Sequence, residues 1–338
     1  MKYNSLFVMM AVCLVFSSCS KSNSSGTAGG GKSFSDATAK TVTVSTLAGS
    51  QAAGNADGAG TAASFNQPSA IATDANDNLY VTDYGNSVIR KITPAGVVTT
   101  TSVAGYADGG IAIDNSGDFY VASGYVPGTV YRFAPDGTRS GWVIPNAGYA
   151  IVYQAIDRNS GSDYISVLGS NIVFTLSSQG VGSQFAQGGD GIHYTRGNTG
   201  LAVDAGGNVF VTENIAYNDG YVSQIYKITP DGTSTLYAGA QTYGSMDGPA
   251  ATATFTFITG IAIDKNNNLF ILDANKVRMV NASGIVSTLA GSAAKGYTDG
   301  SGDQAAFSSP TGISVNKEGT AVYIADNNNN CIRKITAN

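Results

Sequence analysis

The stretch IATDANDNLYVTD, residues 71–83, decides the fold, because the chain repeats its pattern along most of its length. Further copies begin at other positions and read IAIDNSGDFYVAS from Ile111, LAVDAGGNVFVTE from Leu201, IAIDKNNNLFILD from Ile261 and ISVNKEGTAVYIAD from Ile313. A more divergent copy, AIDRNSGSDYISVLG, begins at Ala155. A unit that recurs at this spacing is typical of repeat architectures. The sequence therefore predicts a repeat protein.

Apolar and polar residues alternate within each copy, which indicates β-strands. In the first copy we expect four strands, at residues 70–73, 79–82, 88–93 and 97–103. Four antiparallel strands make one blade of a β-propeller. The fold predicted from the repeats is all-β: a six-bladed β-propeller of four-stranded antiparallel blades.

The two ends of the chain complement each other. The last copy supplies CIRKIT from Cys331 and then stops, without the outer strand that follows this element in earlier copies. The segment TVTVSTLAG from Thr41 matches IVSTLAG from Ile285, which is an outer strand in its own copy. We therefore expect the last blade to be closed by the N-terminal strand, which removes the exposed sheet edges of an open ring.

The composition agrees with short strands joined by tight turns. Only 12% of the residues are charged, whereas glycine occurs 43 times and tyrosine 18 times. The formal net charge of −5 opposes binding to a phosphate backbone. We therefore predict no nucleic-acid partner.

The first residues have the features of an export signal. Lys2 supplies a positive charge, residues 6–16 form an apolar run, and Ser17 and Ser18 precede Cys19. This resembles a bacterial lipoprotein signal, with an ordinary secretory peptide as the alternative. The resemblance implies a signal peptide at 1–18 and a lipid on Cys19. The polar residues 19–40 are expected to form a flexible Ser/Gly tether, and 41–338 the propeller.

Several segments resemble those of the NHL-repeat propellers. They are the Asp after the inner strand, the second strands YVTD (80–83) and FILD (270–273), the third strand GNSVIRKIT (85–93), and the loop DGAGTAASFNQPSAIATD from Asp57. The resemblance covers about residues 41–336. Together with the leader it suggests an NHL-repeat lipoprotein of the Bacteroidetes kind.

The repeated carboxylates at the end of the inner strands have a structural explanation. A short carboxylate before a turn can accept backbone N–H bonds and stabilise that turn. We expect this role for Asp74, Asp114, Asp157, Asp204 and Asp264.

Acidic and aromatic residues in the loops form the predicted binding rim. Carboxylates accept hydroxyl or ammonium donors, and aromatic faces stack on sugars or apolar side chains. If the acids instead cap their loops and the tyrosines pack between blades, no rim exists. The candidate rim comprises Asp57, Asp83, Tyr84, Tyr106, Asp108, Tyr125, Asp190, Glu213, Tyr217, Tyr243, Asp247, Asp273, Tyr297, Asp299 and Asp326.

The sequence gives little support for catalysis. Its one histidine is His193, and it contains neither a GxSxG nor a CxxC pattern. Lactonase-like propellers, in contrast, hold a metal in the central channel with Glu, Asn and Asp. That resemblance leaves Glu213, Asn214 and Asp273 as an alternative metal set for a hydrolase or lyase. We predict no cofactor, with calcium or another divalent ion as the weaker alternative.

These features predict an exported, lipid-anchored propeller that binds without catalysing a reaction. A closed ring holds its loops at fixed spacing, so binding loses little loop entropy. The expected partners are a glycan, a peptide or an envelope protein, and the chain is expected to be a monomer. It is expected in the cell envelope as an outer-membrane lipoprotein, facing either the periplasm or the cell surface.

Overall fold

The structure is a computed structural model, and it describes most of the chain beyond the leader. The described residues are 32–34, 37–38, 40–104, 109–122, 129–134, 136, 138–143, 151–156, 163–167, 172–176, 182–187, 198–217 and 220–338. Predictions for Cys19, Tyr106, Asp108, Tyr125, Asp157, Asp190 and His193, and for the side chain of Tyr217, lie outside the described residues. Within the described part, no helix is both long and apolar enough to span a membrane.

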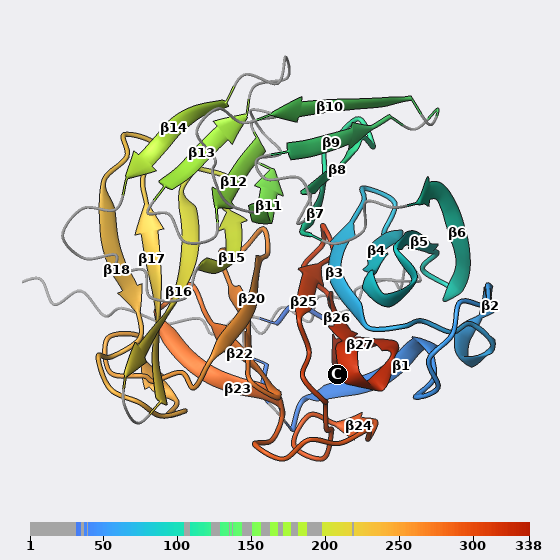
Figure 1. Cartoon of the computed structure of the whole chain (residues 1–338). Coiled ribbons are helices and arrows are strands. Elements are labelled where there is room, and N and C mark those ends of the chain that lie inside the picture. Colours follow the sequence, from blue (N-terminus) through green and yellow to red (C-terminus); the bar gives the residue numbers. More distant parts are fainter. Residues whose placement is uncertain are drawn as a thin grey trace, which may run out of the picture. The chain divides into compact units, whose positions relative to one another are not determined.

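The described strands form six antiparallel sheets arranged around one axis (Figure 1). We number these sheets as blades in chain order, and the first three contain twelve main strands. Blade one has β3 (Pro68–Thr73), β4 (Leu79–Asp83), β5 (Val88–Ile92) and β6 (Val97–Ala104), with the short β2 (Gly58–Ala59) at its edge. Blade two has β7 (Ile111–Ile113), β8 (Phe119–Ala122), β9 (Thr129–Phe133) and β10 (Arg139–Val143). Blade three has β11 (Ile151–Ile156), β12 (Asp163–Val167), β13 (Ile172–Leu176) and β14 (Gly182–Gln187).

The remaining blades follow the same order from the axis outward. Blade four has β15 (Asn198–Val203), β16 (Val209–Tyr217), β17 (Gly220–Ile228) and β18 (Ser234–Ala238). Blade five has β20 (Ile258–Ile263), β21 (Leu269–Asp273), β22 (Lys276–Val280), β23 (Ile285–Gly291) and the short β19 (Gly248–Pro249). Blade six has β25 (Gly312–Val315), β26 (Ala321–Asp326), β27 (Cys331–Ala337), the N-terminal β1 (Val42–Gly49) and the short β24 (Gly300–Ser301). The expected all-β propeller of antiparallel sheets is confirmed.

The N-terminal strand pairs with the C-terminal strand, as the repeat pattern predicts. The register of β1 and β27 runs from Val42 opposite Ala337 to Gly49 opposite Cys331. The N–H of Asn338 also donates to the Thr41 carbonyl at 2.8 Å. Because β1 covers the otherwise open edge of β27, the two ends of the chain hold each other in one sheet.

The turns after the inner strands are stabilised as expected. One carboxylate oxygen of Asp74 accepts the N–H groups of Asn76 and Asn78 at 2.8 and 2.9 Å. The same pair of bonds forms at Asp114, Asp204 and Asp264, and Asn316 accepts two N–H bonds in blade six. The structural role predicted for the four described aspartates is therefore confirmed.

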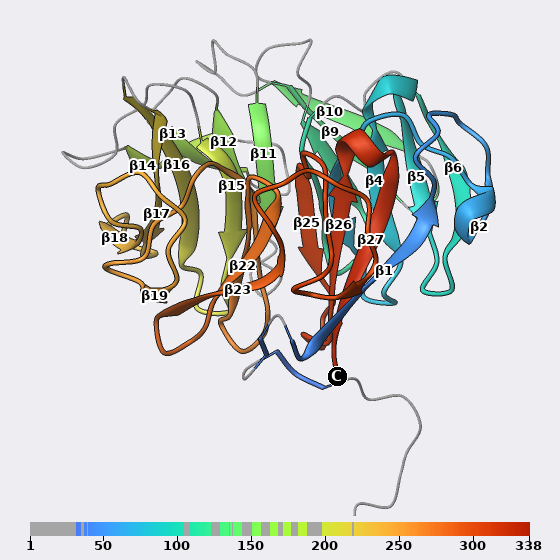
Figure 2. The ribbon, with the colours of Figure 1, turned by 90° about the horizontal axis from the view of Figure 1, so that it is seen from below.

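The antiparallel order gives the ring two different faces. Inner strands end at the aspartate turns, so these turns share one face, which we call the turn face. The connections from second to third strands then lie on the opposite face, which we call the loop face. It includes the 3-10 helices η2 (Tyr84–Asn86) and η3 (Asn327–Asn329), whereas η1 (Gly60–Ala62) belongs to a loop beside β2. Figure 2 shows the beginning of β1 and the C-terminus together on the turn face.

Residues within the predicted tether are packed onto the ring, which corrects its expected boundary at residue 40. Phe34 has no exposed surface, and its ring meets that of Phe270 at 5.2 Å in an edge-to-face contact. Phe34 and Ala37 join the hydrophobic core shared by blades five and six. A single phenylalanine in a polar segment can bury enough apolar area to anchor the backbone around it. The packed structure therefore begins by Lys32, which bridges to Ala337.

Replacing Phe34 should lower the stability of the ring. We expect Phe34→Ala to reduce the free energy of unfolding by about 3–5 kcal/mol, because a buried aromatic side chain is removed from a packed core. Urea denaturation of the purified protein measures this change. Lys40→Ala, at an exposed position, is the control and should leave the midpoint unchanged. Equal midpoints for both variants would show that residues 32–37 are not docked.

Candidate functional site

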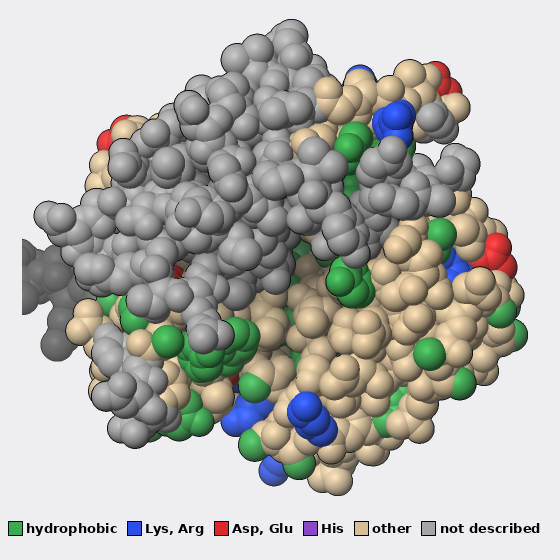
Figure 3. Space-filling view, in the orientation of Figure 1, with side chains coloured by type: hydrophobic (Ala, Val, Ile, Leu, Met, Phe, Trp, Pro, Cys, Tyr) green, Lys and Arg blue, Asp and Glu red, His purple; other side chains and the backbone are tan. Residues whose placement is uncertain are grey.

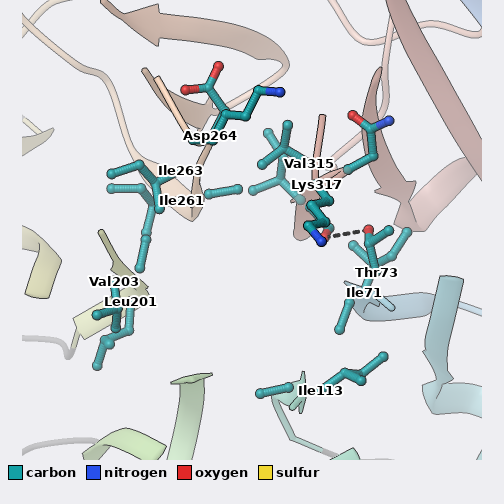
Figure 4. A pocket seen from close by; sticks show the side chains of 18 of the residues that line it. Ile71, Thr73, Ile113, Leu201, Val203, Ile261, Ile263, Asp264, Val315 and Lys317 are labelled. Atoms are coloured by element: carbon teal, nitrogen blue, oxygen red, sulfur yellow. Dashed lines mark hydrogen bonds between the residues drawn. The ribbon is translucent and has the colours of Figure 1, made fainter. Parts of the chain in front are cut away.

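The innermost strands surround a cavity of about 360 Å³ at the centre of the ring. One large aliphatic side chain occupies the same repeat position on each of β3, β7, β15, β20 and β25, and Figure 4 shows several of these side chains around the cavity. These residues are Ile71, Ile111, Leu201, Ile261 and Ile313, each 5–7% exposed. These aliphatic side chains share the described wall of the channel with polar and charged ones, among them Thr73, Asp264 and Lys317.

Small residues allow the inner strands to approach each other closely. A Cβ added to Gly312 would lie 2.5 Å from the Ser69 carbonyl oxygen and 3.0 Å from the Cα of Ala70. A Cβ on Gly200 would lie 2.8 Å from a methyl carbon of Ile261. Glycine before the aliphatic residue of the repeat therefore sets the width of the channel.

The polar groups near the channel are already bonded within the ring. Asp204 and Asp264 line the cavity, but their carboxylates accept hydrogen bonds from their own turns. The hydroxyls of Thr73 and Ser314 bond at 2.8 Å and link blades one and six. Lys265, another lining residue, pairs with Glu318 at 2.7 Å on the exposed surface. These carboxylates therefore stabilise the fold at the place where a ligand could enter.

The acids predicted for the rim of blade one bind a buried arginine instead. The guanidinium of Arg90 has no exposed surface, and it pairs with Asp83 and Asp57, each at 2.9 Å. It also donates to the carbonyls of Ser64 and Ala56, each at 2.8 Å. We call this arrangement of one buried arginine between two aspartates the arginine clamp.

The arginine clamp recurs in blades five and six. Arg278 pairs with Asp273 at 2.7 Å and with Asp247 at 2.6 Å. Arg333 pairs with Asp326 at 2.9 Å and with Asp299 at 2.6 Å. Each guanidinium also lies over a buried phenylalanine ring, at 5.0 Å from Phe65, 5.2 Å from Phe255 and 5.1 Å from Phe307. The clamp thus ties the loop before each of these blades to its second and third strands.

Three rim assignments are corrected by this geometry. Asp83, Asp273 and Asp326 are 0–1% exposed, so the expectation that they point outward is wrong. The arginine on the third strand draws these carboxylates into the blade. Asp57, Asp247 and Asp299 keep 47–49% of their side-chain surface exposed, although each is paired with the same arginine. The IRK and VRM segments of the third strands carried the sequence signal for this pairing.

Burial changes the ionisation of the inner clamp carboxylates of blades one and six, Asp83 and Asp326. Loss of solvent raises the pKa of Asp83, and the bonds from the Asn66 N–H, Asn86 and Arg90 offset only part of this rise. Burial likewise raises the pKa of Asp326. For Asp57, the effect of burial is outweighed by bonds from Thr100 and Arg90, so its pKa is lowered. The two inner carboxylates, Asp83 and Asp326, therefore depend more on neighbouring groups to stay charged than the outer carboxylate Asp57 does.

Blade four lacks the clamp and contains a buried polar network. Tyr226 stands opposite Val211, where blades one, five and six have arginine, and Glu213 is 1% exposed. The Asn214 amide bonds both the N–H and the carbonyl of Ile258 at 2.9 and 2.8 Å, which joins blade four to blade five.

The alternative metal set would have to give up existing bonds. Both Asn214 bonds would be lost if its carbonyl oxygen turned to a metal, and Asp273 already accepts bonds from Thr256, Phe257, Ser245 and Arg278. In the part of the chain that the structure describes, no three His, Cys, Asp or Glu side chains are grouped as metal ligands.

The described tyrosines of the predicted rim have different environments. Tyr84 is 44% exposed and Tyr243 is 61% exposed. The ring of Tyr297 instead lies 5.2 Å from the guanidinium of Arg333. Tyr221 and Phe257, which the sequence reasoning did not select, form an edge-to-face pair at 4.8 Å on the loop face. Their pairing could not be found from spacing alone, because it joins two blades.

Comparison with known families identifies the repeat. Residues 65–92 and 307–335 match the model of the NHL repeat. The chain is a β-propeller in which these two segments match the NHL repeat. Over 98 residues it is 34% identical to Teneurin-3 of Mus musculus, a match that covers 27% of the chain. The chain spans only 4% and 8% of the length of the first curated relatives that it matches.

Solved structures share the propeller fold of this chain. A protein of unknown function from Bacteroides thetaiotaomicron has a TM-score of 0.74 and 23% identity, over 88% of this chain and 76% of that chain. An auxiliary nutrient binding protein from the same organism has a TM-score of 0.70 and 17% identity, over 87% and 76%. A gluconolactonase from Xanthomonas campestris has a TM-score of 0.59 and 12% identity, over 81% and 87%. At these identities the likeness establishes the fold alone.

Removing one clamp arginine should strongly destabilise the propeller. Arg278→Met keeps an aliphatic stem but leaves the carboxylate of Asp273 buried without its cation, so we expect a loss of about 3–5 kcal/mol in the free energy of unfolding. Chemical denaturation measures the loss. Lys265→Met removes an exposed ion pair and should change little. If Arg278→Met were as stable as Lys265→Met, the clamp would contribute little to the free energy of unfolding, contrary to this prediction.

Proposed function

We propose that this NHL propeller is an exported, lipid-anchored protein that binds a glycan, a peptide or an envelope protein without catalysis. The observation that carries the proposal is the arginine clamp, which holds loop-face segments of three described blades in fixed positions. Loops that are already ordered lose little conformational entropy when a ligand binds. A closed ring of six blades, acting as a monomer, suits such a preformed surface.

The environment of the polar residues also favours binding over catalysis. The carboxylates that line the described wall of the channel are bonded to their own turns. The similarity to an auxiliary nutrient binding protein supports a binding role. The similarity to a gluconolactonase keeps a hydrolase or lyase in the channel as the alternative.

The attachment of the N-terminal segment suits a lipid anchor on Cys19. The described chain enters the ring on the turn face, where Ser33 accepts a hydrogen bond from Asn266 at 3.3 Å. Residues 20–31 would then connect a lipidated Cys19 to this point of attachment.

A thermal-shift screen tests the binding proposal. The mature protein is heated with neutral oligosaccharides, peptide mixtures and divalent cations, with and without a chelator. A ligand that binds only the folded state raises the midpoint by mass action. A rise with a glycan or a peptide that is insensitive to the chelator supports the proposal. A rise with a divalent cation that Glu213→Gln abolishes would favour the channel enzyme instead.

The lipid anchor has its own test. Cys19→Ser should move the protein from the membrane fraction to the soluble fraction, because the thioether attachment site is lost. Immunoblots of fractionated cells measure the distribution. Cys13→Ser, inside the predicted signal peptide, is the matched control and should remain in the membrane fraction. Equal partitioning of Cys19→Ser and the parent would contradict the anchor.

A further inference from the structure

An exposed aromatic cluster lies on the loop face where blade four meets blade five. Its members are Tyr221, Tyr243, Met246 and Phe257, and we call this cluster the aromatic platform. Tyr243 and Met246 are 61% and 58% exposed, the two highest values among the exposed large hydrophobic residues of the described chain. Figure 3 shows hydrophobic side chains gathered on the visible face over this border. An exposed patch of this kind marks an interaction site more often than a chance surface.

The long hairpin of blade four builds one half of the aromatic platform. β16 and β17 each have nine residues, so they extend beyond the four- to six-residue second strands of the other blades. The extension places Tyr221 against Phe257 of blade five. It also places Gly220, at φ +146°, beneath the ring of Tyr243, where an added Cβ would lie 3.0 Å from two ring carbons. The glycine therefore lets one ring face rest on the hairpin backbone.

The arginine clamp of blade five holds the other half in place. Arg278 donates to the Met246 carbonyl at 3.0 Å, and the Met246 N–H donates to the Thr254 hydroxyl at 2.9 Å. The Gly239 N–H closes the loop by donating to the Ala250 carbonyl at 2.9 Å. The Tyr243 side chain thus projects from a backbone that is fixed on both sides. A rigid aromatic on an ordered loop contributes contact area at a small entropic cost.

The charges of the blade-five clamp beside the aromatic platform cancel. Asp247 and Asp273 carry two negative charges, and Arg278 and Lys276 carry two positive ones. Lys276 faces Asp273 in the register, whereas Val88 and Cys331 occupy this position in blades one and six. The clamps of those two blades therefore keep one unbalanced negative charge, and blade five does not. A ligand at this border meets aromatic rings, hydroxyls and the balanced charges of the blade-five clamp.

We propose that the aromatic platform binds a neutral carbohydrate, with a sugar ring stacked on Tyr243. The axial C–H face of a sugar packs on an aromatic ring, while its hydroxyls bond to neighbouring polar groups. A charged glycan or a highly charged peptide gains no attraction from the balanced charges of the blade-five clamp. This inference rests on the proposed function and names the ligand class and the place where it binds.

Titration of the mature protein with neutral hexasaccharides of glucose, xylose and mannose tests the proposal. Isothermal calorimetry at millimolar sugar measures affinity for the parent, Tyr243→Ala, Tyr243→Phe and Leu236→Ala. We expect one sugar class to bind the parent, and Tyr243→Ala to weaken it about tenfold, the usual size of one aromatic contact. Tyr243→Phe keeps the ring and should bind within about twofold of the parent. Leu236→Ala, at an exposed apolar position of β18 outside the predicted rim, is the control and should bind like the parent.

The negative outcomes distinguish an error about the aromatic platform from an error about the proposed binding function. Unchanged sugar binding by Tyr243→Ala would overturn the platform and leave a binding protein with another site. Binding of a peptide or protein, but of no neutral sugar, would overturn the ligand class alone. Absence of any binding partner in the thermal-shift screen, together with silent calorimetry, would overturn both. Equal melting midpoints of Tyr243→Ala and the parent confirm that the variant is folded.

Discussion

The structure depends on burying a guanidinium between two carboxylates. An uncompensated buried charge is costly, so Arg90, Arg278 and Arg333 can have no solvent exposure only because each meets an inner aspartate, an outer aspartate and backbone carbonyls. The outer aspartate lies in the loop that leads into the blade, whereas the arginine lies on the third strand. One ion-pair network therefore connects segments more than twenty residues apart in the chain.

The burial of these ion pairs changes how the acidic residues of the loop face are interpreted. The repeated acids look like an exposed acidic rim, but six of the seven described ones pair with buried arginines, and three of these six are themselves buried. Their contribution to binding is indirect: they fix the loops on which other side chains are presented. Blade four, where Tyr226 replaces the arginine, lengthens its hairpin instead and provides aromatic surface. Variation between blades thus places a candidate binding surface at one border of a quasi-symmetric ring.

Local patterns predicted much of the fold. Alternation in residues 71–83 predicted paired strands, and the match between Thr41 and Ile285 predicted the pairing of β1 with β27. The aspartate turns were predictable because each carboxylate bonds N–H groups only two and four residues later. The packing of Phe34 was not predictable from the polar composition around it, because its partner Phe270 is distant in the chain.

The sequence by itself determined the repeat unit, the strand order within each blade and the closure of the last blade, since these depend on periodicity and on interactions between neighbouring elements. Only the tertiary structure decided which carboxylates are buried, which tyrosines are exposed, and where Tyr221 meets Phe257. Burial and ion pairing depend on the distances between blades, and the width of the channel follows from close contacts such as Gly312 against Ser69. Spacing along one chain does not contain those distances.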